Sequence, residues 1–258
     1  MSIDLNVSDE GIALITINRP ERLNAMDAEH YQALSRAWCT VRDDSAIRVA
    51  IVTGAGERSF TTGADIKSFL TAPPGLSEMW LTQRDQLLNR GLEVWKPVVA
   101  AVNGYCLGGG VTLLLATDIR IAASHATFSL AEVKRGVIPA NGGTQRVLDQ
   151  LPYAVAMEML LTGEGINALA AERWGLVNKV VAQADLLETA YVYARRIAAN
   201  APLAVQAAKG LAVRSRDMDL TTGLRMEAVL NRMLMLTEDA KEGPAAFAAR
   251  RTPLFKGQ

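Results

Sequence analysis

The sequence is poor in the side chains that most often carry metal or nucleophilic chemistry. Its 258 residues include two cysteines, Cys39 and Cys106, and two histidines, His30 and His125. The cysteines form neither a C-x-x-C pair nor a cluster with histidine, so we expect no metal site and a reduced compartment. We also expect no His-based catalytic pair, because His125 falls in a predicted surface turn and His30 in a predicted amphipathic helix.

An excess of charge and long apolar runs are also lacking. Lys and Arg number 27, Asp and Glu number 27, and the net charge is zero, which argues against an electrostatic binder of nucleic acid or membrane surfaces. Acidic residues near the N-terminus do not suit a signal peptide, and no apolar stretch approaches the length of a membrane span. We therefore expect a soluble, cytoplasmic protein without membrane or nucleic-acid partners.

The remaining composition suits a large folded core. Hydrophobic residues make up 50% of the chain, enough for one large domain or a core with a smaller appendage. Near residue 196 the mixture of predicted strands and helices gives way to helix alone, so we predict a core over 1–196 and a helical region over 197–258. We interpret the apolar, methionine-rich face of that region as core or subunit interface. This face consists of Leu224, Val229, Leu230, Met233, Leu234 and Leu236.

One stretch, Val98 to Ala122, organises the chain. The pattern predicts a buried strand over 98–102, a glycine loop containing Gly108–Gly110, a buried helix over 111–116 and a second strand from Ile119. Glycines at a helix N-terminus leave bare N–H groups where partial positive charge collects, which suits an anion. Close packing of helix against strand without any ligand explains the glycines equally well.

A second small-residue loop, Thr62 to Asp65, follows another predicted strand over 49–53. A strand, a small-residue turn and a helix thus occur twice in the same sense, which indicates stacked β–β–α units. Stacking places both loops at one edge, where an N–H group from each can converge on a single oxygen. Neither loop has the spacing of a P-loop or a dinucleotide-binding motif.

Glu132 is the best acid–base candidate, because it lies in the mostly apolar run 128–133. If its side chain faces an apolar pocket, desolvation raises its pKa and fits the carboxyl for proton transfer. The alternative is a surface salt bridge to Lys134 or Arg135.

Several motifs, in order along nearly the whole chain, resemble the crotonase (enoyl-CoA hydratase/isomerase) superfamily. They are Asn18-Arg19-Pro20 with Leu23-Asn24-Ala25, Thr62 to Lys67, Val102 to Gly110, Phe128 to Glu132, Ile138-Pro139 with Gly142 to Arg146, Leu161-Thr162-Gly163, and Ala246-Phe247 with Arg251 and Phe255 to Gly257. The resemblance implies an α/β fold, a crotonase-like spiral of β–β–α units with a C-terminal helical trimerisation region. It also implies homotrimers or hexamers, a coenzyme A thioester substrate and no separate cofactor.

The resemblance further implies roles for single residues. The backbone N–H groups of Ala64 and Gly109 hold the thioester oxygen as it becomes an enolate, and Glu132 moves the proton. The residues implied to bind substrate are Arg22, Ala25, Ala64, Asp65, Ile66, Lys67 and Gly109, with Phe255 and Lys256 from a neighbouring subunit and Asn141 and Trp80 at the acyl pocket.

The chain departs from the hydratase pattern at Thr112. Hydratases of this family hold one water between two glutamates, and Thr112 stands in place of the first. A hydroxyl can hold a water but cannot take its proton at neutral pH, and loss of a general acid or base typically costs about 10²–10⁴-fold. We therefore predict an enoyl-CoA hydratase/isomerase-type enzyme with Glu132 as its single acid–base residue, leaning toward isomerisation.

Three alternatives stay open at this point. The first is another crotonase reaction, such as double-bond isomerisation, decarboxylation, dehalogenation or thioester hydrolysis. The second is a non-catalytic member that binds acyl-CoA or RNA, although balanced charge argues against RNA. The third is a scaffold whose glycines only pack.

Overall fold

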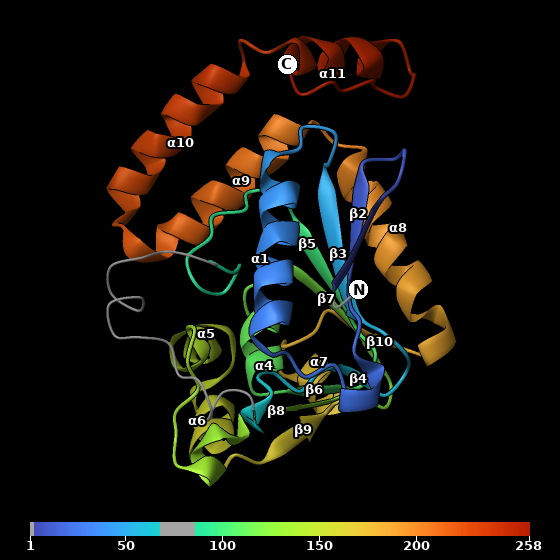
Figure 1. Cartoon of the computed structure of the whole chain (residues 1–258). Coiled ribbons are helices and arrows are strands. Elements are labelled where there is room, and N and C mark those ends of the chain that lie inside the picture. The colour runs from blue at the N-terminus through green and yellow to red at the C-terminus, as the bar shows by residue number, and fades with distance from the viewer. Residues whose placement is uncertain (1–2, 68–85) are drawn as a thin grey trace.

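A computed structural model describes residues 3–67 and 86–258 (Figure 1). The strands are β1 (Ile3–Val7), β2 (Ile12–Ile17), β3 (Val49–Gly54), β4 (Ser59–Thr61), β5 (Val98–Val102), β6 (Tyr105–Leu107), β7 (Ile119–Ala123), β8 (Thr127–Ser129), β9 (Gly165–Asn167) and β10 (Lys179–Val181). The helices are α1 (Ala28–Asp43), α4 (Gly109–Leu114), α5 (Gly143–Gln150), α6 (Tyr153–Thr162), α7 (Ala168–Arg173), α8 (Leu186–Ala198), α9 (Pro202–Arg214), α10 (Leu220–Leu234) and α11 (Glu238–Ala248). Short 3₁₀ helices are η1 (Pro20–Arg22), η2 (Ala131–Arg135), η3 (Gln183–Asp185) and η4 (Ser215–Asp217).

The chain winds as a spiral that adds one strand to each of two sheets per turn. Among the described residues the larger sheet has the order β1-β2-β3-β5-β7-β10 and the smaller has the order β4-β6-β8-β9. β3 leads into β4, β5 into β6 and β7 into β8, and these successive strands pair in parallel within their sheets. The predicted stacking of β–β–α units is confirmed.

Two helical layers bury the larger sheet on both sides, which is why its central strands are apolar throughout. Side chains alternate along β3, so Val49 and Ile51 pack toward α8 whereas Ala50 and Val52 belong to the core that includes Trp38 of α1. Figure 1 shows α1 and α8 on opposite sides of this sheet. The fold therefore holds the loops between strands on a rigid frame.

The predicted elements differ from the structure in detail. α4 begins at Gly109 rather than at 111, and the short strand β6 occupies part of the predicted glycine loop. Leu87 and Leu88 are buried and lie outside any helix. Trp80 and Leu81 lie outside the described residues.

The C-terminal helices extend away from the two sheets, with α10 standing apart from the core at the top left of Figure 1. Part of the predicted apolar face is exposed, including Val229 at 60% and Met233 at 59%. Leu230 and Met226 instead line a groove between α10 and α9. The predicted boundary near 196 falls in the last turn of α8. None of the helices in the described part of the chain is both long and apolar enough to span a bilayer.

Candidate active site

The two glycine-bearing loops meet at the N-terminus of α4. The Met26 N–H donates to the Gly63 carbonyl and the Asp65 N–H donates to the Met26 carbonyl, both at 2.8 Å. These two hydrogen bonds fix the Thr62–Asp65 loop. A Cβ placed on Gly63 lies 2.5 Å from the Gly109 nitrogen, and a Cβ placed on Gly109 lies 3.6 Å from the Ala64 nitrogen. Gly63 also has a φ of +82°, so only glycine suits this approach.

This approach brings together two backbone donors from different turns of the spiral. Among the described residues, neither the Ala64 N–H nor the Gly109 N–H donates a hydrogen bond. Both donors remain available at the positive end of α4, an arrangement that stabilises an oxyanion. The structure thus brings together the two N–H groups that the family resemblance implied.

Glu132 lies against the same glycine loop. The Gly108 N–H donates to the Ser129 carbonyl at 2.8 Å, which ties the loop to β8 just before η2 and Glu132. A Cβ placed on Gly108 lies 3.2 Å from Glu132 Oε1. Glu132 Oε2 is buried and lacks a hydrogen-bond partner among the described residues. Burial raises the pKa of Glu132, whereas a hydrogen bond from its own backbone and the charge of Arg135 lower it.

The neighbouring cations have other partners. The Lys134 ammonium pairs with Glu164 at 2.5 Å, and the Arg135 guanidinium donates to the Ala131 carbonyl at 3.2 Å. The surface salt bridge considered for Glu132 is therefore not formed among the described residues. A partly desolvated carboxyl beside an oxyanion site has the environment that proton transfer requires.

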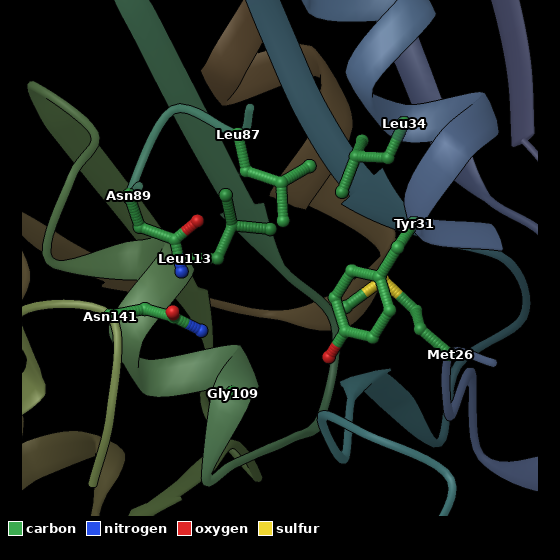
Figure 2. Close-up of a pocket in the computed structure, with 8 residues that line it drawn as sticks. All are labelled: Met26, Tyr31, Leu34, Leu87, Asn89, Gly109, Leu113 and Asn141. Carbon is green, nitrogen blue, oxygen red and sulfur yellow. The ribbon is translucent and has the colours of Figure 1, made fainter. Parts of the chain in front are cut away.

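A small cavity opens beside Gly109 (Figure 2). Its volume is about 10 Å³, room for about one water molecule. It is lined by Met26, Tyr31, Leu34, Leu87, Asn89, Gly109, Leu113 and Asn141. Figure 2 shows the Tyr31 ring reaching from α1 toward the start of α4. Burial raises the pKa of Tyr31 to about 12, so its hydroxyl stays protonated and able to donate.

Comparison with known proteins decides the family. The model of the enoyl-CoA hydratase/isomerase family matches residues 8–258. The chain belongs to this family. It is 45% identical over 257 residues to the (E)-benzylidenesuccinyl-CoA hydratase of Thauera aromatica and 41% identical over 278 aligned residues to the carnitinyl-CoA dehydratase of Salmonella arizonae, covering 100% of both chains in each case.

Solved structures agree with this assignment. An enoyl-CoA hydratase from Bacillus anthracis superposes with a TM-score of 0.92 at 34% identity, covering 100% of each chain. One from Mycobacterium tuberculosis superposes with a TM-score of 0.91 at 36% identity, covering 100% of this chain and 99% of the other. The resemblance, the crotonase fold and an enzyme of hydratase/isomerase type are confirmed.

Thr112, where this family member departs from the hydratase pattern, is buried in α4. Its hydroxyl donates to the Gly109 carbonyl at 3.1 Å and accepts from Asn89 Nδ2 at 3.0 Å. A hydroxyl has one hydrogen, so Thr112 has none left for a water. Asn89 carries no sequence motif, and sequence reasoning missed it.

The segment that contains Arg22 and Ala25 lies beside the loop that contains Asp65. Arg19 joins them, because its Nη1 donates to the Ala25 carbonyl and to Asp65 Oδ2, both at 3.1 Å. Ile66 is half exposed next to this junction and Lys67 follows it. The structure thus brings the segment of Arg22 and Ala25 next to the loop of Asp65, two of the segments that the resemblance implies for substrate binding.

Phe255 and Lys256 lie elsewhere in the same chain. Arg48, just before β3, donates to the Phe255 carbonyl at 2.6 Å, and the Lys256 N–H donates to Asp239 Oδ1 at 2.7 Å. Arg48, Phe255 and Lys256 thus lie at the end of the larger sheet where β3 begins. β3 runs from there toward the opposite end, from which the chain continues to the loops of the site (Figure 1). The pair therefore does not reach the site of its own chain, which leaves the predicted contribution to a neighbouring subunit as a prediction.

The cysteine and histidine side chains do not line the cavity. Burial raises the pKa of the Cys106 thiol far above its usual value. His30 Nδ1 lies 2.7 Å from Asp27 Oδ1, and His125 Nε2 lies 2.8 Å from the Glu57 carbonyl on the surface. The described residues contain no group of three or more His, Cys, Asp or Glu arranged to hold a metal.

Proposed function

We propose that the enzyme hydrates an enoyl-CoA thioester and catalyses the reverse dehydration, through an enolate held by the Ala64 and Gly109 N–H groups. The observation that carries this proposal is the Glu132 carboxyl next to Gly108, whose buried Oε2 has no hydrogen-bond partner among the described residues. Two related proteins are a hydratase and a dehydratase of CoA thioesters, which supports water as the second reactant. The reaction needs no cofactor beyond the coenzyme A of the substrate.

Charge explains how the site acts. Addition at the β-carbon moves the electrons of the double bond onto the thioester oxygen. The two fixed N–H donors and the N-terminus of α4 stabilise that charge more than the neutral carbonyl, which lowers the barrier. Glu132 takes a proton from the water and returns it to the α-carbon, so one carboxyl serves as base and then as acid.

Double-bond isomerisation is the second candidate. Thr112 leaves Glu132 as the single carboxyl that we place at the site, and one base can remove a proton and return it at another carbon. Isomerisation requires the same enolate but no water. A panel of enoyl-CoA thioesters assayed for both hydration and double-bond migration separates the two reactions.

We also propose that the helical region 197–258 assembles the enzyme into trimers or hexamers in the cytoplasm. The exposed Val229 and Met233 on α10 support a subunit interface. The distance of Phe255 and Lys256 from the site of their own chain is consistent with a contribution across that interface.

The variant Glu132→Gln tests the central proposal. Gln keeps the size of the side chain and removes its ability to accept a proton, so hydration of crotonyl-CoA falls by about 10²–10⁴-fold. Exchange of the α-protons of butyryl-CoA into deuterated water disappears as well, while binding changes little. Full exchange in this variant removes Glu132 from the mechanism.

A further inference from the structure

Asn89 presents a buried acceptor at the wall of the cavity. The residue is 6% exposed, and its Oδ1 is buried without a hydrogen-bond partner in the part of the chain that the structure describes. In Figure 2 the Asn89 side chain extends toward α4 beside Leu87 and Leu113. Folded proteins rarely leave a buried amide oxygen unpaired, so the position indicates a ligand that donates a hydrogen bond.

The hydrogen bonds around Asn89 fix which atom faces the ligand. The single hydrogen of the Thr112 hydroxyl goes to the Gly109 carbonyl, which can only accept. Thr112 must then accept from the amide nitrogen of Asn89. Oδ1 is the polar atom of the Asn89 side chain that remains for a ligand.

The backbone of Asn89 is also held in place. Arg146 Nη1 donates to the Asn89 carbonyl at 3.2 Å and to the Asn141 carbonyl at 2.9 Å, so one guanidinium joins two walls of the cavity. Both ends of Asn89 are therefore fixed before any substrate arrives. Such preorganisation is what an interaction that must orient a reactant requires.

We propose that Asn89 Oδ1 holds the water that adds to the β-carbon, and holds the β-hydroxyl in the reverse reaction. This inference rests on the proposed hydratase function. The cavity has room for about one water, and it reaches from Asn89 to Gly109, whose neighbour Gly108 lies against Glu132. Asn89 thus orients the water in a chain where Thr112 replaces the first glutamate of the hydratase pattern.

The atoms of the step balance. The water oxygen bonds to the β-carbon while Glu132 takes one proton, and the electrons of the double bond move to the thioester oxygen. Glu132 then gives the proton to the α-carbon, and the electrons return from the oxygen. The second hydrogen of the water stays on the new hydroxyl and is donated to Asn89 Oδ1. Asn89 accepts a hydrogen bond and never a proton, because an amide is not a base at neutral pH.

Two reactions of the same enzyme separate this role from a structural one. Hydration of crotonyl-CoA needs the oriented water, whereas α-proton exchange of butyryl-CoA needs only Glu132 and the two N–H donors. The variant Asn89→Leu keeps a similar size and removes the acceptor. We expect its hydration kcat to fall about 10- to 100-fold, with α-proton exchange within about 3-fold of the original enzyme.

Leu113→Met is the matched control, because Leu113 lines the same cavity without a polar group. We expect it to change hydration and exchange by the same factor. Should Asn89→Leu fail to fold, the pair Asn89→Ser and Asn89→Ala gives the same comparison. Both are small, only Ser keeps an acceptor, and we expect Ser to hydrate faster at equal exchange.

The outcomes distinguish this inference from the proposed function. Unchanged hydration in Asn89→Leu, or an equal loss of hydration and exchange, overturns the role of Asn89 while leaving the function intact. Equal hydration by the Ser and Ala variants overturns it as well. An unmodified enzyme that exchanges α-protons but adds no water to any enoyl-CoA overturns the hydratase proposal itself.

Discussion

Replacing Gly63 by Ala tests whether the close approach of the two loops forms the oxyanion site. The new Cβ lies 2.5 Å from the Gly109 nitrogen, whereas ordinary contact begins at 3.4 Å. The neighbouring atom is backbone, so the loops must move apart by about 0.9 Å. Donors act on an oxyanion at about 2.7–3.1 Å, and such a shift moves one of them out of range.

The expected loss follows from that displacement. Removal of one donor costs about 2.7–4 kcal/mol of transition-state stabilisation, or about 10²–10³-fold in kcat. The left-handed backbone at φ +82° adds about 1–2 kcal/mol of destabilisation to any L-residue. The assay is steady-state hydration of crotonyl-CoA, with thermal unfolding measured on the same sample.

Gly175→Ala is the control for the stability lost when a residue with a side chain adopts a left-handed backbone. Gly175 has a φ of +79°, and a Cβ placed on it meets nothing within 4 Å. It follows α7, and its added Cβ would touch neither of the two loops. This variant should lose a similar amount of stability and keep its kcat. If Gly63→Ala folds and retains kcat within about 3-fold of the original enzyme, the two amides do not form the site.

Three further predictions concern pH and assembly. Because burial raises the pKa of Glu132 above its ordinary 4.5, the rate of hydration should fall with decreasing pH at a midpoint above 4.5, and a lower midpoint contradicts the assignment. The same shift favours the neutral carboxyl, so Glu132→Gln should raise the thermal midpoint at pH 7 but not below pH 4. Val229→Asp on α10 should shift the assembly toward monomers in light scattering while the exposed Glu227→Gln leaves it unchanged; an unaltered mass in Val229→Asp excludes this face as the interface.

The buried parallel strands could be predicted because both of their faces are covered. β3 and β5 appear in the sequence as short continuous apolar runs between turn residues, a pattern that is typical of strands buried on both faces. β6 was missed because three residues carry too little periodicity. α4 starts at the glycines although glycine disfavours helix. The backbone of the Thr62–Asp65 loop packs so closely against this point that a side chain would not fit between them.

The candidate site was predictable only where local sequence carried the signal. Glu132 stood out because an acid in an apolar run is unusual, and the glycine loops stood out through their composition. Asn89 carried no such signal, because its burial and its bond to Thr112 arise from residues 23 apart that meet only in the folded chain. Tyr31 likewise reaches the cavity from α1 through tertiary packing.

The origin of the two amides in successive turns of the spiral has a consequence for refolding. Neither turn contains the oxyanion site alone, so no fragment that stops before α4 can stabilise an enolate, however well its strands form. Helical circular dichroism can therefore recover before catalysis does during renaturation. The return of α-proton exchange reports the moment at which β4 and β6 align side by side.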